Sequence, residues 1–202
     1  RLDMFLVNFF VNVTFVGYYA VSVSLAEMLW FLPASIATVL LPKASSNDEK
    51  QNNKFTPMIC RHTFFVTFVF AILLVVFGKI IIKMLFGENF IPAFLPLLFL
   101  VPGVLIFSIQ SVLASDIVGR GKPEINAWIS FIGLVLTIVF DILLIPKYRI
   151  VGAAIASSIS YTVCTFITVF IFLRISGNKL KSLILVTKED LGAYKKIFEK
   201  IK

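Results

Sequence analysis

The sequence has little charge, few cysteines and one histidine. Asp, Glu, Lys and Arg make up 15% of its 202 residues, whereas about a quarter is usual in a water-soluble domain. The two cysteines, Cys60 and Cys164, form no CxxC pair, and His62 is the one histidine, so the sequence contains no set of metal ligands. We therefore expect no metal site and no cofactor.

Apolar side chains dominate instead. Hydrophobic residues make up 59% of the chain, 22 of them are Phe, and the mean hydropathy is +0.97. This composition favours a membrane protein over a soluble protein with an unusually large core. The net charge of +8 does not indicate nucleic-acid binding, because the basic residues lie between or after the apolar runs, as they do in cytoplasmic loops.

Six apolar segments account for most of the chain. They occupy residues 1–15, 18–41, 63–82, 91–117, 125–145 and 150–173, and all except the first are long enough to cross a bilayer. Each is predicted to be a helix, because lipid cannot satisfy unpaired backbone groups. We expect an all-α, polytopic membrane helical bundle of six helices over residues 1–176, with a tight turn near Gly17.

The chain begins at Arg1, inside the first apolar segment, without an initiator Met or a signal peptide. We therefore expect the first helix to be truncated and an N-terminal half to be missing.

The distribution of Lys and Arg predicts the orientation. Most of them lie in the connections 43–62 and 119–124 and in the tail from residue 174, whereas the other side carries Lys79, Lys83, Lys147 and Arg149. The positive-inside rule then predicts a cytoplasmic C-terminus. In the basic tail, 177–202, Thr187 and Asp190 resemble a capping box, which is typical of a helix start. This tail is predicted to be either an amphipathic helix on the inner leaflet or a solvated segment.

Several short motifs follow one another in a recognisable order. They are Gly17-Tyr18-Tyr19, Ala26-Glu27-Met28-Leu29-Trp30, Leu85-Phe86-Gly87-Glu88, Leu100-Val101-Pro102-Gly103, Gly119-Arg120-Gly121-Lys122-Pro123, Leu143-Leu144-Ile145-Pro146-Lys147-Tyr148 and Val151-Gly152-Ala153-Ala154. Together they resemble the second six-helix lobe of the polysaccharide exporters, the Wzx-type branch of the superfamily that also contains the multidrug and toxin extruders and the lipid II flippases. Two positions depart from that family, which usually has Asn in place of Asp141 and Gly in place of Arg149.

The resemblance implies a transporter rather than an enzyme, with two lobes around a polar cavity. Such a protein would move an undecaprenyl-diphosphate-linked oligosaccharide across the bacterial cytoplasmic (inner) membrane by alternating access, for surface polysaccharide biosynthesis. The partners that it implies are the bilayer, the lipid-linked substrate, the missing N-terminal lobe and polysaccharide polymerase machinery. A multidrug or cation antiporter of the same superfamily, or an integral membrane glycosyltransferase or polymerase, is the alternative.

Charged residues inside apolar segments are costly in lipid and therefore mark candidate sites. Arg1 and Asp3 are expected near the middle of the membrane, and Ser24 and Glu27 begin a narrow polar stripe at helical spacing that continues to Ser35 and Thr38. These four, Arg1, Asp3, Ser24 and Glu27, are the predicted cavity residues. Arg1 would bind the diphosphate, and Glu27 or Asp3 would carry a coupling ion. Structural ion pairs are the alternative.

Three further features lie in the second half of the chain. Pro102 and Gly103 predict a hinge or a static kink, because proline removes a backbone hydrogen bond. The row Gly152, Ala156, Ser160 and Cys164 favours close helix packing over substrate contact. Asp116 is expected to be an interfacial charge near the turn that begins at Gly119.

Overall fold

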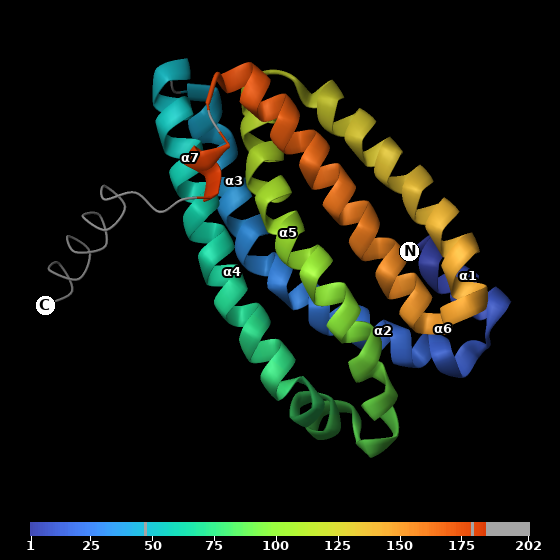
Figure 1. The fold of residues 1–202 in the computed structure, drawn as a ribbon. Helices are drawn as coiled ribbons and strands as arrows, with labels where there is room; N and C mark the ends of the chain where they lie inside the picture. The colour runs from blue at the N-terminus through green and yellow to red at the C-terminus, as the bar shows by residue number, and fades with distance from the viewer. Residues whose placement is uncertain (47, 179, 185–202) are drawn as a thin grey trace, which may run out of the picture.

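The computed structural model describes residues 1–46, 48–178 and 180–184. Over these residues the chain contains helices and no strands (Figure 1), which confirms the predicted all-α bundle. In chain order the elements are α1 (Leu2–Phe10), α2 (Val13–Glu27), η1 (Met28–Trp30), α3 (Phe31–Ser46), α4 (Glu49–Phe86), η2 (Glu88–Ala93), α5 (Phe94–Gly119), α6 (Pro123–Ser176) and α7 (Lys181–Ile184). The predicted amphipathic helix from Thr187 lies outside the described residues.

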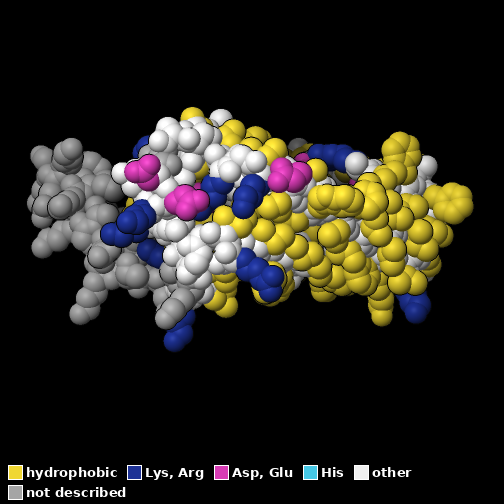
Figure 2. Space-filling view, turned by 90° about the horizontal axis from the view of Figure 1, so that it is seen from above, with side chains coloured by type: hydrophobic (Ala, Val, Ile, Leu, Met, Phe, Trp, Pro, Cys, Tyr) yellow, Lys and Arg dark blue, Asp and Glu magenta, His cyan; other side chains and the backbone are white. Residues whose placement is uncertain are grey.

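Among the described residues, four helical segments are long and apolar enough to cross a membrane: Val13–Ser46, Glu49–Phe86, Glu88–Gly119 and Pro123–Ser176. The last has 54 residues, far more than the roughly 20 that one crossing needs. Its chain direction reverses at Arg149, so that the limbs 123–148 and 150–176 run antiparallel, side by side (Figure 1). In Figure 2, hydrophobic side chains cover most of the part of the surface where α6 lies, with a few basic side chains at its edges, as expected for a surface that faces lipid.

The first turn lies earlier than the sequence pattern predicts. α1 ends at Phe10 and α2 begins at Val13, so Gly17 lies inside a helix and the predicted turn there was wrong. Asn12 caps α2, because its side-chain oxygen accepts a hydrogen bond from the backbone N–H of Phe15 at 3.1 Å. Asn is a favoured residue at this position, but a hydropathy pattern does not register a capping amide.

Two helices extend beyond the apolar stretches that predicted them. α3 continues to Ser46 rather than ending at residue 41, and α4 begins at Glu49 rather than at residue 63. The added turns are polar, so hydropathy does not mark them as helical.

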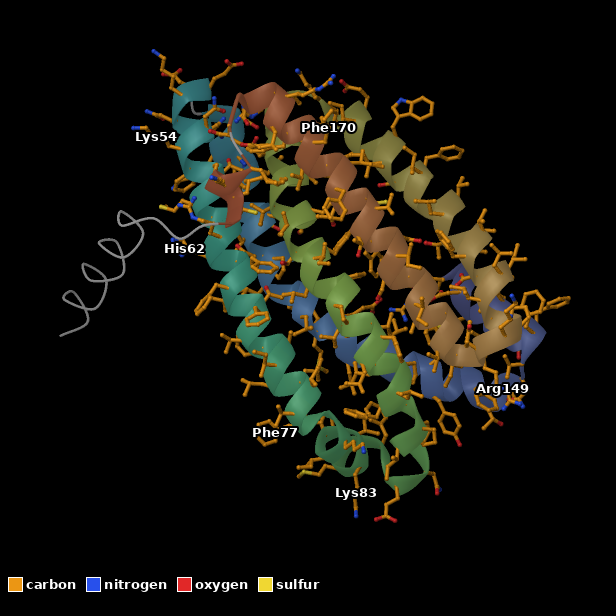
Figure 3. The ribbon with its side chains drawn as sticks, viewed as in Figure 1. Lys54, His62, Phe77, Lys83, Arg149 and Phe170 are labelled. Carbon is orange, nitrogen blue, oxygen red and sulfur yellow. The ribbon has the colours of Figure 1, made fainter. Side chains whose placement is uncertain are left out.

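Lys54 and His62 lie toward one end of the molecule and Lys83 and Arg149 toward the other (Figure 3), which fits the sides that the Lys and Arg distribution assigns to them.

α5 is the central helix, because α3, α4 and α6 all pack against it. The contact between α5 and α6 is close at Gly103, where an added Cβ would lie 2.5 Å from the Cα of Ser158. Ser158 also donates a hydrogen bond to the carbonyl of Phe99 in α5. Pro102 has no backbone N–H, so the carbonyl groups in this turn of α5 have fewer donors within the helix. In membrane proteins a side-chain hydroxyl from a neighbouring helix commonly donates to such carbonyl groups.

Small residues also join the two limbs of α6. Gly152, Ala156, Ser160 and Cys164 are all buried, which confirms the predicted packing row. At Gly152 an added Cβ would lie 2.3 Å from the carbonyl oxygen of Leu144, so glycine permits the close approach beside the reversal.

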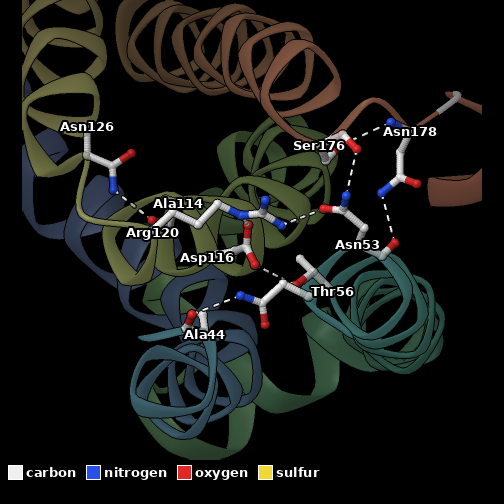
Figure 4. Close-up of polar contacts among 10 residues, drawn as sticks. Ala44, Asn53, Thr56, Ala114, Asp116, Arg120, Asn126, Ser176 and Asn178 are labelled. Atoms are coloured by element: carbon white, nitrogen blue, oxygen red, sulfur yellow. Dashed lines mark hydrogen bonds and ion pairs between the residues drawn. The ribbon is translucent and has the colours of Figure 1, made fainter. Parts of the chain in front are cut away.

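The end of the bundle that carries Lys54 is held by a buried polar network (Figure 4). Asp116 is fully buried, which corrects the expectation of an interfacial charge. Its carboxylate accepts hydrogen bonds from the Thr56 hydroxyl at 2.7 Å and from Arg120 Nε at 2.6 Å. Arg120 also donates to the Asn53 side chain at 2.8 Å, and the Asn53 amide donates to the carbonyl of Ser176 at 2.8 Å. The network thus joins α4, α5 and the end of α6.

Arg149 has an unfavourable backbone conformation at the reversal in α6. Its φ of 53° is the one positive value at a non-glycine position in the described chain, and the family resemblance has glycine here. A side chain in such a conformation costs of order 1–3 kcal/mol. Its guanidinium lies 5.5 Å from the ring centroid of Phe15, a contact that offsets part of this cost.

We expect Arg149→Gly in the full-length protein to raise the free energy of unfolding by about 1 kcal/mol, because the strain exceeds the lost ring contact. Thermal unfolding in detergent measures the change. Arg149→Ala is the matched control, since it removes the guanidinium and keeps the strained φ, and it should bring no gain. A glycine variant that is less stable than the alanine variant would contradict the assignment of strain.

Candidate functional site

A cavity of about 210 Å³ lies between α1, α2, α5 and both limbs of α6. Its charged lining residues are Arg1, Asp3 and Glu27. The structure therefore brings together three of the four predicted cavity residues. The volume is below the roughly 300–1,000 Å³ of a site for a drug-sized ligand, so these helices by themselves do not enclose a ligand of that size.

Arg1 and Glu27 form an ion pair across this cavity. Arg1 Nη2 lies 2.6 Å from Glu27 Oε2, and the two side chains are 55% and 30% exposed. Arg1 directly precedes α1, and Glu27 is the last residue of α2. Because both groups remain accessible, an anion that enters the cavity competes with Glu27 for the guanidinium of Arg1.

Asp3 is held by a tyrosine in the wall of the same cavity. The Tyr19 hydroxyl donates to Asp3 Oδ2 at 2.9 Å and lies 3.5 Å from Ser157 Oγ. Tyr19 is fully buried, and it connects α1, α2 and the second limb of α6. The carboxylate of Asp3 is therefore oriented by a buried hydroxyl.

Ser24 does not belong to this site. It is exposed and does not line the cavity, unlike Glu27. The face of α2 that lines the cavity carries Tyr19, Val23, Ala26 and Glu27. Ser24 lies about 60° around the helix from Glu27, beyond the edge of that face. Further along, the predicted stripe assumed a continuous α-helix, but the 3₁₀ turn η1 interrupts it at Met28–Trp30. A 3₁₀ turn has three residues per turn instead of 3.6, so it rotates everything after it out of register. Ser35, beyond η1, lines a different hollow.

Asp141 is a neighbouring residue that was not among the predicted cavity residues. It is fully buried in the first limb of α6, one turn beyond the cavity residue Thr137. Among the described residues, neither of its carboxylate oxygens has a hydrogen-bond partner, and the nearby Asp3 interacts with it electrostatically. An unpaired carboxylate in such a place costs several kcal/mol unless it takes up a proton or a cation. Two signals for Asp141 were available in the sequence: the family usually has Asn here, and Asp141 follows Thr137 by four residues, one helical turn.

Two aromatic side chains, Trp30 and Tyr161, line the cavity, and the ring of Phe107 packs against both. The ring centroids of Trp30, Phe107 and Tyr161 are 5.2–5.6 Å apart in all three pairs. They come from η1, α5 and α6, and only the tertiary structure joins them. Sequence periodicity along any one helix contains no signal for this cluster.

Comparisons with known proteins agree on one class of protein. A family model described as lipid II flippase MurJ matches residues 2–194. Capsular polysaccharide biosynthesis protein CapF of Staphylococcus aureus is 32% identical over 145 residues, which are 70% of this chain and 37% of CapF. Agl15 of Haloferax volcanii, described as a probable low-salt glycan biosynthesis flippase, is 24% identical over 173 residues, 81% of this chain and 36% of Agl15.

A membrane protein of Methanocaldococcus jannaschii is 29% identical over 165 residues, 79% of this chain and 32% of that protein. The chain thus spans about a third of the length of these relatives. No solved structure matched the chain in the same comparisons.

Proposed function

We propose a transport function from one premise: this chain belongs to the lipid II flippase MurJ family. Membership confirms the superfamily that the ordered motifs predicted. The proposed activity of the whole protein is to flip an undecaprenyl-diphosphate-linked oligosaccharide across the bacterial cytoplasmic membrane by alternating access. The C-terminus would be cytoplasmic, and an N-terminal lobe would complete the cavity.

The Arg1–Glu27 pair is the observation that carries this proposal. Diphosphate forms charge-assisted hydrogen bonds with a guanidinium, and two phosphates compete well against one carboxylate. Substrate binding would therefore displace Glu27 from Arg1. The released carboxylate would then take up a proton or a cation, together with Asp3 and the buried Asp141, and so couple transport to an ion gradient.

The charge of the cavity supports a second candidate, a cation antiporter. Arg1 supplies one positive charge while Asp3 and Glu27 supply two negative ones, so the described lining is net negative. A negative cavity favours a cationic substrate. A fluorescent organic cation tested in the same vesicles distinguishes this candidate from the flippase.

The flippase proposal predicts that Glu27→Gln in the full-length protein slows translocation about tenfold, the effect of losing roughly 1.4 kcal/mol of a charge-assisted interaction. Proteoliposomes containing a fluorescent undecaprenyl-diphosphate saccharide, probed with a membrane-impermeant quencher, measure the rate. Ser24→Ala is the control, because Ser24 lies three residues away but outside the cavity, and it should transport at the wild-type rate. No translocation by the wild-type protein refutes the flippase, whereas an unimpaired Glu27→Gln variant removes only Glu27 from the mechanism.

A further inference from the structure

A second hollow runs along the outside of the bundle between the α2–α3 segment and α4. Its larger part, about 800 Å³, is lined by apolar side chains such as Leu29, Phe70 and Phe77, with Ser35 and Thr67 as its polar lining residues. Ser35 also lines a smaller part of about 430 Å³, which extends to Lys43 and His62. We call the two parts together the α3–α4 groove.

The groove exists because of how the helices pack. α3 and α4 each pack extensively on α5 but touch each other much less, so the space between them is left unfilled. On α4 the lining residues run from Phe55 to Ile81, roughly 39 Å at 1.5 Å per residue. This exceeds the roughly 30 Å thickness of a bilayer core, so the groove is long enough to extend from one membrane interface through the apolar part of both leaflets.

One end of the α3–α4 groove is basic. Lys43 lies in the last turn of α3, exposed, with its Nζ 4.6 Å from the ring centroid of Phe55. His62 lines the same end, which is the end marked by Lys54 in Figure 3. No Asp or Glu is among the described residues that line either part of the groove. The lining thus has positive charge at one membrane interface and an apolar channel leading inward from it.

We propose that the α3–α4 groove binds an anionic phospholipid of the cytoplasmic leaflet, with its phosphate at Lys43 and an acyl chain in the apolar channel. The cytoplasmic leaflet carries the anionic lipids, and basic pockets between helices on that side bind their headgroups. The proposal rests on the predicted orientation, which places Lys43 at that leaflet. The groove shares no lining residue with the cavity at Arg1, so its lipid is separate from the transported one.

The test is equilibrium binding of dioleoylphosphatidylglycerol to the full-length protein in detergent, counted by native mass spectrometry. Lys43→Gln should weaken the site about fivefold, the contribution of one basic residue near an anionic lipid. Lys54→Gln removes the same charge at the same end of the molecule but outside the groove, and it should leave the site intact. Val39→Trp fills the basic part of the groove and should abolish the site, whereas Val139→Trp, on the exposed surface of α6, should not.

Several outcomes would overturn the proposal. Equal losses in the Lys43 and Lys54 variants would show general electrostatic attraction instead of a site. Equal binding of dioleoylphosphatidylcholine would exclude headgroup recognition, and a neutral Val39→Trp would exclude the groove. Displacement by undecaprenyl phosphate would assign the groove to the transported lipid. These results come from binding and do not depend on transport. The groove proposal can therefore fail while the flippase proposal stands, and the reverse.

Discussion

Arg120→Leu is expected to destabilise the full-length protein by about 3–5 kcal/mol, the usual effect of removing one partner of a buried ion pair. The Asp116 carboxylate is fully buried and the Arg120 side chain is only 6% exposed. Without Arg120, the Thr56 hydroxyl is the one remaining side-chain donor that the structure shows for the carboxylate. The link from Arg120 to Asn53, and through it to the end of α6, would be lost as well.

Thermal unfolding in detergent, calibrated against a reversible denaturant series, measures this loss. Arg174→Leu is the matched control: Arg174 is exposed, near the end of α6, and contacts the ring of Phe170 at 4.5 Å, so its replacement should cost less than 1 kcal/mol. The double variant Asp116→Leu/Arg120→Leu should recover much of the stability, since it leaves no unpaired charge. Equal losses of unfolding free energy in the Arg120 and Arg174 variants would show that the buried ion pair stabilises the protein no more than the exposed contact does.

Gly103→Ala is expected to destabilise the protein by about 1–3 kcal/mol, as overpacking does in a tightly packed core. The added methyl group would lie 2.5 Å from the Cα and 2.6 Å from the Oγ of Ser158. Backbone atoms cannot move aside as the end of a flexible side chain can. α5 and the second limb of α6 must therefore separate, which also strains the hydrogen bond from Ser158 to the carbonyl of Phe99.

Gly17→Ala is the matched control for this prediction. Gly17 lies inside α2, and the nearest atom to its added Cβ is Phe90 Cε1 at 3.9 Å. The same chemical change there should raise stability by about 0.5–1 kcal/mol, because alanine favours a helix. If the two variants are equally stable, the helices do not meet closely at Gly103. The predicted hinge at Pro102 and Gly103 is a separate question: α5 continues through both residues, and bending there remains a prediction.

The fold class followed from composition, but the details of the cavity did not. Long apolar runs with few charges form helices in lipid, because a helix satisfies all of its backbone hydrogen bonds internally. Arg1, Asp3 and Glu27 could be identified from the sequence because a charged side chain inside an apolar run is costly in lipid and usually faces a cavity or a partner. Ser24 was misplaced because it lies beyond the edge of the α2 face that Tyr19, Val23 and Ala26 present to the cavity. The 3₁₀ turn at Met28–Trp30, which has no hydropathy signal, then separates Ser35 from the same stripe.

Sequence alone determined that the chain is a helical membrane bundle of a lipid-linked sugar exporter family, because hydropathy and ordered motifs are properties of the linear chain. Tertiary structure alone decided which polar groups meet: Arg1 pairs with Glu27, and Asp116 is buried with Arg120. It also decided that Asp141 is buried without a hydrogen-bond partner among the described residues, and that a groove lies between α3 and α4. The physical reason is that helix periodicity fixes which residues share a face of one helix. The angle and distance at which two faces meet depend on side chains that are far apart in sequence, such as Gly103 and Ser158.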